Sequence, residues 1–183
     1  KPCIGDFGMM APLYGHLGRD PKPLSLMTLH AVRLFRWVER MNRPEPDIGE
    51  FKNKQESYLE GDHIPTTLID ALKHFAKDFV PECKSACEKI NSWLNENKQL
   101  SSGTDVDRSV GACSFIASGI RIQAEAQPFR FYLLKRVQDE FESLSKDDSR
   151  IVETMLGDCD MAELLDMKLS RSIGRKNNLE VWL

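Results

Sequence analysis

The chain has 183 residues, and its 41% content of hydrophobic side chains is enough to bury one sizeable core. Its 25 basic and 28 acidic residues give a net charge of -3, and the two signs alternate along the chain. This pattern argues against nucleic acid as a partner, because phosphate binding needs a concentrated basic surface. The apolar runs fall well short of the roughly 20 residues that span a bilayer, so we expect no membrane segment.

The first predicted helix covers residues 4–17, where apolar residues recur at steps of three and four and predict a core helix. These are Ile4, Phe7, Met10, Leu13, Tyr14 and Leu17. Asp6 follows Cys3 by three positions, which is the spacing of a capping box, although Cys3 replaces the usual Ser or Thr. Pro12 lacks a backbone N–H and should kink the helix.

Gly18 and the prolines that follow it predict a turn, and a second helix is then expected to run without a break to Met41. The prolines within 42–47 end that helix, and a polar loop is expected over 49–62. The next helix should be the longest, about seven turns from Pro65, with a kink at Pro81. Its apolar stripe comprises Leu68, Leu72, Phe75, Phe79, Cys83, Cys87, Ile90 and Leu94.

Residues 113–126 break the helical pattern, because apolar and polar side chains alternate there as in a half-buried strand that includes Ile120. We predict a short β-hairpin over this range. A helix follows over 128–144, with Phe129, Leu133, Arg136, Val137, Phe141 and Leu144 on one face. Two short helices near 147–157 and 161–167 come next, and the apolar tail at 179–183 is expected to pair with the Ile120 segment. The predicted fold is mainly α.

The five cysteines are odd in number and scattered, which indicates a reducing compartment, and we predict a cytoplasmic location. Cys83 and Cys87 stand four residues apart on a predicted helix. That spacing suits a metal or redox pair, but it equally suits two small buried side chains. We favour the second interpretation and predict no metal site, because no further Cys or His pair lies nearby in the sequence.

Tyr14 and His16 are candidates for ligand binding, since both precede the turn at 18–20, at a helix end. The structural alternative is a His beside the carbonyl dipoles of the helix end and a core Tyr with a bonded hydroxyl. Arg19 is similarly either a ligand clamp or the partner of Asp20 in an ion pair that fixes the turn. We favour the structural alternative for all three residues, Tyr14, His16 and Arg19.

Two aromatic features also admit two interpretations. Trp37 could form a pocket wall but has the spacing of a core residue. The run Gln127–Tyr132 could stack a nucleobase or an aromatic ligand, although core packing at a helix start is favoured. The sequence lacks the usual metalloprotease, phosphate-loop and nucleophile motifs, so we assign no catalytic residue.

The run Pro2-Cys3-Ile4-Gly5-Asp6-Phe7-Gly8-Met9-Met10-Ala11-Pro12-Leu13 resembles the core helix of the C-terminal domain of glutathione S-transferases. Asp6 matches the Asp of that family's capping box, whereas Cys3 departs from its Ser or Thr. The continuation, Tyr14 to Pro21 and Arg36 to Asn42, resembles bacterial-type members with a long C-terminal extension.

The resemblance implies a single helical domain over 1–183, with core helices at 1–47 and a helical extension at 48–183. It implies a hydrophobic co-substrate pocket. The binding candidates Tyr14, His16, Arg19 and Trp37 come from the residue patterns described above and are not carried over from the family. In the family, glutathione is the co-substrate and is held by a thioredoxin-like N-terminal domain, which this sequence does not contain. We therefore expect this chain to be a piece of a longer protein and to be inactive by itself. A homodimer is the expected native form.

Two alternatives remain open at the level of the sequence. One is a non-catalytic helical module that acts through protein contacts, and the other is a carrier that binds an apolar small molecule without reacting with it.

Overall fold

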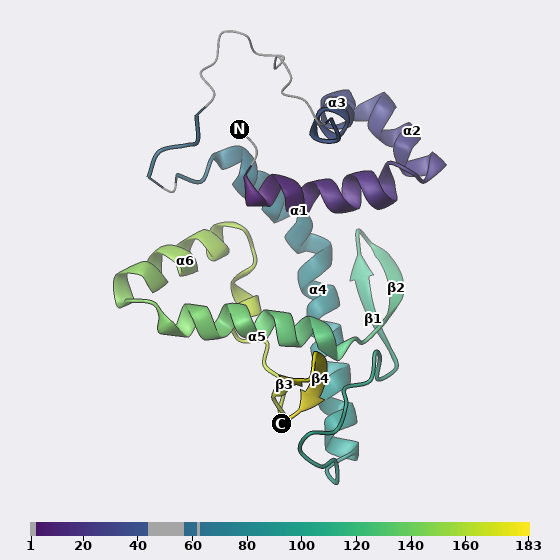
Figure 1. Cartoon of the computed structure of the whole chain (residues 1–183), viewed down its shortest axis with the longest axis vertical. Helices are drawn as coiled ribbons and strands as arrows, with labels where there is room; N and C mark the ends of the chain where they lie inside the picture. Colours follow the sequence, from purple (N-terminus) through teal and green to yellow (C-terminus); the bar gives the residue numbers. More distant parts are fainter. Residues whose placement is uncertain (1–2, 44–56, 62) are drawn as a thin grey trace. The chain divides into compact units, whose positions relative to one another are not determined.

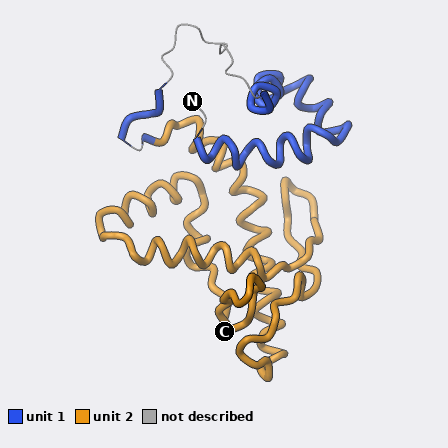
Figure 2. The backbone as a smooth tube through the Cα atoms, viewed as in Figure 1, with its two compact units in different colours: residues 1–63 blue, residues 64–183 orange. Residues whose placement is uncertain are grey.

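The computed structural model describes residues 3–43, 57–61 and 63–183, which form mainly helices with two small antiparallel sheets (Figure 1). The chain divides into two compact units, Lys1–His63 and Ile64–Leu183, which are coloured separately in Figure 2. The mainly helical class predicted from the sequence is confirmed. The single-domain organisation with its boundary at 47/48 stays a prediction, and the loop predicted over 49–62 lies largely outside the described residues.

The first unit opens with α1 (Ile4–Pro12), which passes directly into the π-helical turn η1 (Leu13–Leu17). The Asp6 carboxylate accepts a hydrogen bond of 2.7 Å from the Cys3 backbone N–H, the backward contact of a capping box. Directly after Pro12, where we predicted a kink, the backbone changes from α-helical to the wider π-helical hydrogen-bonding pattern. The Gly18 N–H donates to the carbonyl of Leu13, five residues back, at 2.7 Å.

The expectation that the first helix is buried along its stripe is wrong. Ile4 is 91% exposed and Phe7 is 60% exposed, and no side chain of α1 is buried. Within η1, Leu13 is buried, and it packs with Met27 and Val38 in a small apolar cluster. Helical periodicity identified the element, but it did not show that only one end of the stripe meets a core.

The second predicted helix is in fact two helices, α2 (Pro21–His30) and α3 (Val32–Met41). Ala31 separates them with φ -133° and ψ 46°, outside helical geometry. The prolines at the start of α2 stand where a helix tolerates them, because its first N–H groups have no intrahelical acceptor. The break itself has no local signal, since neither Gly nor Pro stands at Ala31.

The second unit is organised around α4 (Thr66–Glu96), a helix of 31 residues that confirms the predicted longest helix. The stripe predicted along it is buried in its C-terminal half, at Cys83, Cys87, Ile90 and Leu94. In the N-terminal half Leu68, Phe75 and Phe79 are exposed, and Ala76 and Val80 are buried instead. The apolar residues of the stripe are spaced about 3.7 residues apart on average, whereas an α-helix has 3.6 residues per turn. The stripe therefore winds slowly around the helix, and one half of it turns away from the core.

The remaining elements of this unit follow α4 in chain order. They are β1 (Ala112–Ala117), β2 (Ile120–Glu125), α5 (Pro128–Ser143), α6 (Lys146–Asp158), the 3-10 turn η2 (Ala162–Leu165), β3 (Ile173–Lys176) and β4 (Leu179–Trp182). The core of the unit joins the C-terminal half of α4 to Phe131, Ile173 and Trp182, and the Trp182 ring stacks on Trp93 with centroids 6.0 Å apart. The two short helices predicted after α5 are present as α6 and η2.

The predicted hairpin near 113–126 is confirmed as the antiparallel pair β1–β2. Ser118 and Gly119 connect the strands with φ of 49° and 80°, the left-handed conformation that a tight hairpin turn requires. The Asp78 carboxylate accepts a hydrogen bond of 2.8 Å from the Ser118 N–H and tethers the turn to α4. The predicted half-burial of β2 is wrong, since Ile120 at its start is 67% exposed.

The predicted pairing of the chain's tail with the Ile120 segment is also wrong. β4 pairs with β3, through a turn at Asn177 and Asn178 with φ of 52° and 64°. Asn accepts this conformation more readily than most residues, which explains a two-residue turn without Gly. On its other side β4 contacts residues 103–106, where the Trp182 N–H donates to the Thr104 carbonyl at 2.9 Å.

Candidate functional site

The residues proposed from the sequence as ligand contacts lie in the first unit, where two of them meet. The Arg19 guanidinium lies over the Tyr14 ring, 5.4 Å from its centroid, in a cation–π contact. The ion pair expected between Arg19 and Asp20 is absent from this described turn, so that expectation is wrong. Trp37 and Tyr14 both pack on the apolar cluster of the unit, and the exposed His16 contributes its carbonyl to the helix end.

The cysteine pair on α4 is buried, as the structural interpretation required. Burial raises the pKa of the Cys83 thiol to about 11, and it raises the pKa of Cys87 as well. Both thiols therefore stay protonated near neutral pH, which disfavours nucleophilic or redox chemistry. Within the described part of the chain, no three His, Cys, Asp or Glu side chains gather as metal ligands.

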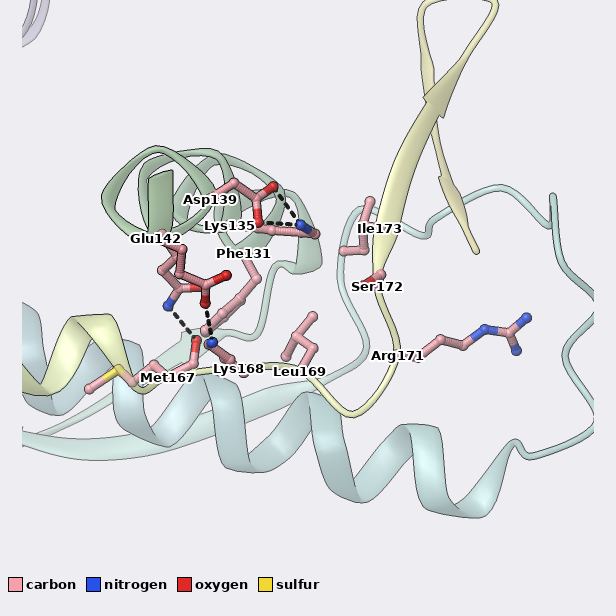
Figure 3. Close-up of a pocket in the computed structure, with 11 residues that line it drawn as sticks. Phe131, Lys135, Asp139, Glu142, Met167, Lys168, Leu169, Arg171, Ser172 and Ile173 are labelled. Atoms are coloured by element: carbon pink, nitrogen blue, oxygen red, sulfur yellow. Dashed lines mark hydrogen bonds and ion pairs between the residues drawn. The ribbon is translucent and has the colours of Figure 1, made fainter. Parts of the chain in front are cut away.

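A pocket of about 210 Å³ lies in the second unit, between α5 and the segment 167–173 that leads into β3 (Figure 3). Its apolar lining consists of Phe131, Met167, Leu169 and Ile173. Three of these are at most 8% exposed, and only Leu169 is partly exposed, so the inner wall belongs to the core of the unit. The volume lies below the roughly 300–1,000 Å³ of pockets for drug-sized ligands, which indicates a smaller molecule.

The face that α5 turns toward this pocket differs from the one predicted. Phe129, Leu133 and Val137, expected on the buried face, are between 43% and 61% exposed. The buried positions are Pro128, Phe131 and Gln138. The helix carries two competing stripes, and the buried one contains a glutamine, so an apolar pattern alone selects the wrong face.

The run Gln127–Tyr132, considered as an aromatic platform, divides between two environments. Phe129 is exposed and lies 6.3 Å from Tyr132 between ring centroids, whereas Phe131 faces the pocket. Arg130 is paired with Glu82 of α4 instead of being free for a ligand. Core packing at the helix start therefore describes Phe131 and not Phe129.

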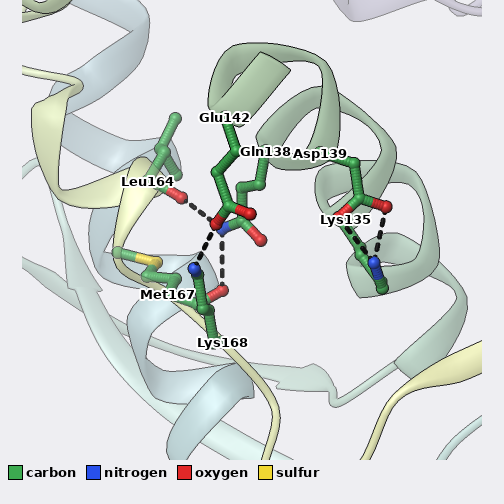
Figure 4. A network of polar contacts seen from close by, with 7 residues as sticks. All are labelled: Lys135, Gln138, Asp139, Glu142, Leu164, Met167 and Lys168. Atoms are coloured by element: carbon green, nitrogen blue, oxygen red, sulfur yellow. Dashed lines mark hydrogen bonds and ion pairs between the residues drawn. The ribbon is translucent and has the colours of Figure 1, made fainter.

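Gln138 is the polar group at the inner wall of the pocket, and it is only 5% exposed. Its Nε2 donates to two backbone carbonyls, that of Leu164 at 2.8 Å and that of Met167 at 3.1 Å (Figure 4). Both amide hydrogens are thereby used, which fixes the orientation of the amide plane. The sequence held a signal for this site, since Phe131, Lys135, Gln138 and Glu142 follow at steps of four, three and four.

Two ion pairs form the rim. Lys135 pairs with Asp139, and the Lys168 Nζ donates to a Glu142 oxygen at 2.6 Å (Figure 4). The hydrogen bond to Glu142 raises the pKa of the Lys168 ammonium. Lys168 therefore keeps its proton and is a poor base or nucleophile near neutral pH.

Arg171 lines the pocket, but its guanidinium turns away from the other lining groups (Figure 3). Its Nε donates to the Leu183 carbonyl at 2.8 Å, and its Nη1 donates to the Leu100 carbonyl at 2.7 Å. This cation holds backbone segments together. It fixes the pocket wall between η2 and β3 without offering its charge to a ligand.

Comparison with known proteins adds no relative: no family model, no curated protein and no solved structure matches the chain. Among the described residues, no helix combines the length and the apolar character that crossing a membrane requires.

Proposed function

We propose that this chain is a small-molecule-binding helical protein that holds a small ligand between α5 and residues 167–173, with an apolar inner wall and a polar rim around it. The observation that carries the proposal is the pocket itself, with an inner wall of core side chains and one oriented amide. Ligand pockets usually combine an apolar wall with polar groups held in fixed positions, and the core side chains and the Gln138 amide supply these two parts here.

The same lining favours binding without chemistry. It contains neither Cys nor His, and both rim carboxylates accept hydrogen bonds from lysines. Acid–base or nucleophilic catalysis needs a group whose protonation can change near the working pH. Lys168, held protonated by Glu142, lacks that property.

The glutathione S-transferase resemblance forms the second part of the proposal. It is supported by residues 2–46 of the sequence, the Asp6 contact with the Cys3 N–H and the mainly helical fold. In that setting a thioredoxin-like domain of the native protein would bind glutathione, and this chain would supply scaffold and a hydrophobic co-substrate pocket. A cytoplasmic homodimer is the form that we expect.

A protein-interaction module is the second candidate, and the exposed face of α5 favours it. Phe129, Leu133 and Val137 are spaced four residues apart and lie on one side of the helix. Replacing Val137 by Lys should then weaken association measured by sedimentation. If the unaltered chain and the Val137→Lys variant both sediment as monomers, self-association through this face is contradicted.

Fluorescence titration with small aromatic ligands tests the main proposal. Trp182 pairs with Ile173 across the β3–β4 ladder, and Ile173 lines the pocket, so its emission should respond to occupancy. A Trp37→Phe background removes the signal of the first unit. We expect a saturable change, and a flat response to every apolar ligand would refute the proposal.

An activity assay with glutathione and a standard electrophile supplies the complementary test. We expect no conjugation by this chain alone, and measurable turnover would contradict the non-catalytic role.

A further inference from the structure

Gln138, the buried polar side chain of the pocket lining, carries a hydrogen-bond acceptor that no described residue uses. Both amide hydrogens of Gln138 are donated to backbone carbonyls, so its Oε1 cannot exchange places with Nε2 without breaking two hydrogen bonds. No described residue donates a hydrogen bond to Oε1, although every fully buried side-chain nitrogen and oxygen in the described residues has a partner, so this oxygen still reaches solvent. Oε1 therefore remains open to the pocket, where Figure 4 shows it without a dashed line.

The charges around the pocket are matched within the protein. The pairs Lys135–Asp139 and Lys168–Glu142 are each neutral in sum, and the Arg171 guanidinium is directed at backbone carbonyls. A charged ligand would have to compete with these partners. An uncharged ligand needs to displace none of them.

From these observations we infer that the pocket selects an uncharged, one-ring-sized molecule that donates an N–H or O–H hydrogen bond to Gln138 Oε1. This inference rests on the proposed ligand-binding function and adds the chemical class of the ligand. A donor-free molecule would cover the oxygen without replacing its contact with water, which carries a desolvation cost. Selectivity for a donor follows from that cost.

Three probes of similar size separate hydrogen-bond donation, hydrogen-bond acceptance and apolar contact. The hydroxyl of p-cresol donates and accepts hydrogen bonds, the nitrile of p-tolunitrile only accepts them, and p-xylene does neither. Affinities are measured by NMR titration of the whole chain, following the Ile173 and Trp182 amides. We expect p-cresol to bind about tenfold tighter than either other probe, the scale of one well-placed hydrogen bond. This order of affinities is the reverse of the order expected from hydrophobicity alone, because p-xylene is the most hydrophobic of the three probes.

A Gln138→Met variant removes the acceptor at similar side-chain length, and the preference for p-cresol should vanish in it. Gln123→Met, on exposed β2, is the matched control and should keep the preference. If Gln138→Met fails to fold, the probe series on the unaltered chain still decides the matter.

The other outcomes overturn the inference in distinguishable ways. Equal binding of all three probes would show an unselective apolar pocket and would leave the proposed function standing. Equal binding of p-cresol and p-tolunitrile, both above p-xylene, would assign recognition to the rim lysines. Absence of binding by every probe would overturn both this inference and the proposed function.

Discussion

The buried amide of Gln138 gives the sharpest test of how this unit is held together. In a Gln138→Met variant the hydrogen bonds of 2.8 and 3.1 Å to Leu164 and Met167 are lost, and two backbone carbonyls lose their donor. A typical hydrogen bond contributes about 0.5–1.5 kcal/mol net, and an unsatisfied buried group costs about 1–3 kcal/mol. Allowing for the added apolar burial of Met, we expect a loss of about 2–4 kcal/mol in the free energy of unfolding.

Urea denaturation followed by tryptophan emission measures this loss, in a Trp37→Phe background so that Trp93 and Trp182 report on the second unit. The transition midpoint should fall, and the slope should stay constant if the variant still folds in the same way. Gln123→Met should shift stability by less than about 0.5 kcal/mol. A loss below about 1 kcal/mol for Gln138→Met would refute the reasoning, because water would then be replacing the amide at both carbonyls.

Four further predictions concern the core, the thiols and a turn. Ile90 is 0% exposed, and Ile90→Ala should lower the free energy of unfolding by about 2–5 kcal/mol. A loss under about 1 kcal/mol would contradict its central place in the core. A thiol reagent should label exposed Cys3 rapidly at pH 8 and Cys83 only on unfolding, and equal rates in the native protein would show that α4 opens readily. Folding raises the pKa of Cys83 from 9.0 to about 11, so the free energy of unfolding should be constant below pH 9 and should fall as the pH rises toward 11. After allowance for solvent screening, the expected loss is about 1 kcal/mol. Cys83→Ala should reduce this dependence of the unfolding free energy on pH, and an identical pH dependence in the variant would contradict the assignment. Asn178→Gly, at a φ of 64°, should preserve or slightly raise thermal stability, whereas Asn178→Val should lower it by about 1 kcal/mol; equal melting temperatures would refute the turn argument.

Local sequence signals predicted the elements of the second unit well. The length of α4 followed from an apolar stripe long enough to outweigh Pro81, and the β1–β2 hairpin followed from two-residue alternation. Both signals depend on neighbours close in the sequence. The β3–β4 hairpin carried a signal too, since Asn177-Asn178 between short apolar segments is suited to a tight turn.

The candidate site could be predicted only in part, because its geometry depends on partners far apart in the chain. Gln138 is buried because two carbonyls from the segment after α6 accept its hydrogen bonds, and no periodicity on α5 can reveal them. The break at Ala31 is similar, since no residue type at that position forbids a continuous helix. The turn at 18–20 and the aromatic character of Trp37 directed attention to Tyr14, His16, Arg19 and Trp37, none of which lines the pocket.

The two-sided pairing of β4 has a consequence for solubility. A strand with one unpaired edge presents a row of N–H and C=O groups that can recruit a strand from another molecule. Here β3 occupies one edge, and the Gly103 N–H and Thr104 carbonyl contact Trp182 from the other, at 2.7 and 2.9 Å. An apolar segment that would favour intermolecular β-aggregation if exposed is thus protected on both edges in the native state, and local unfolding of residues 103–106 is the event that would expose it.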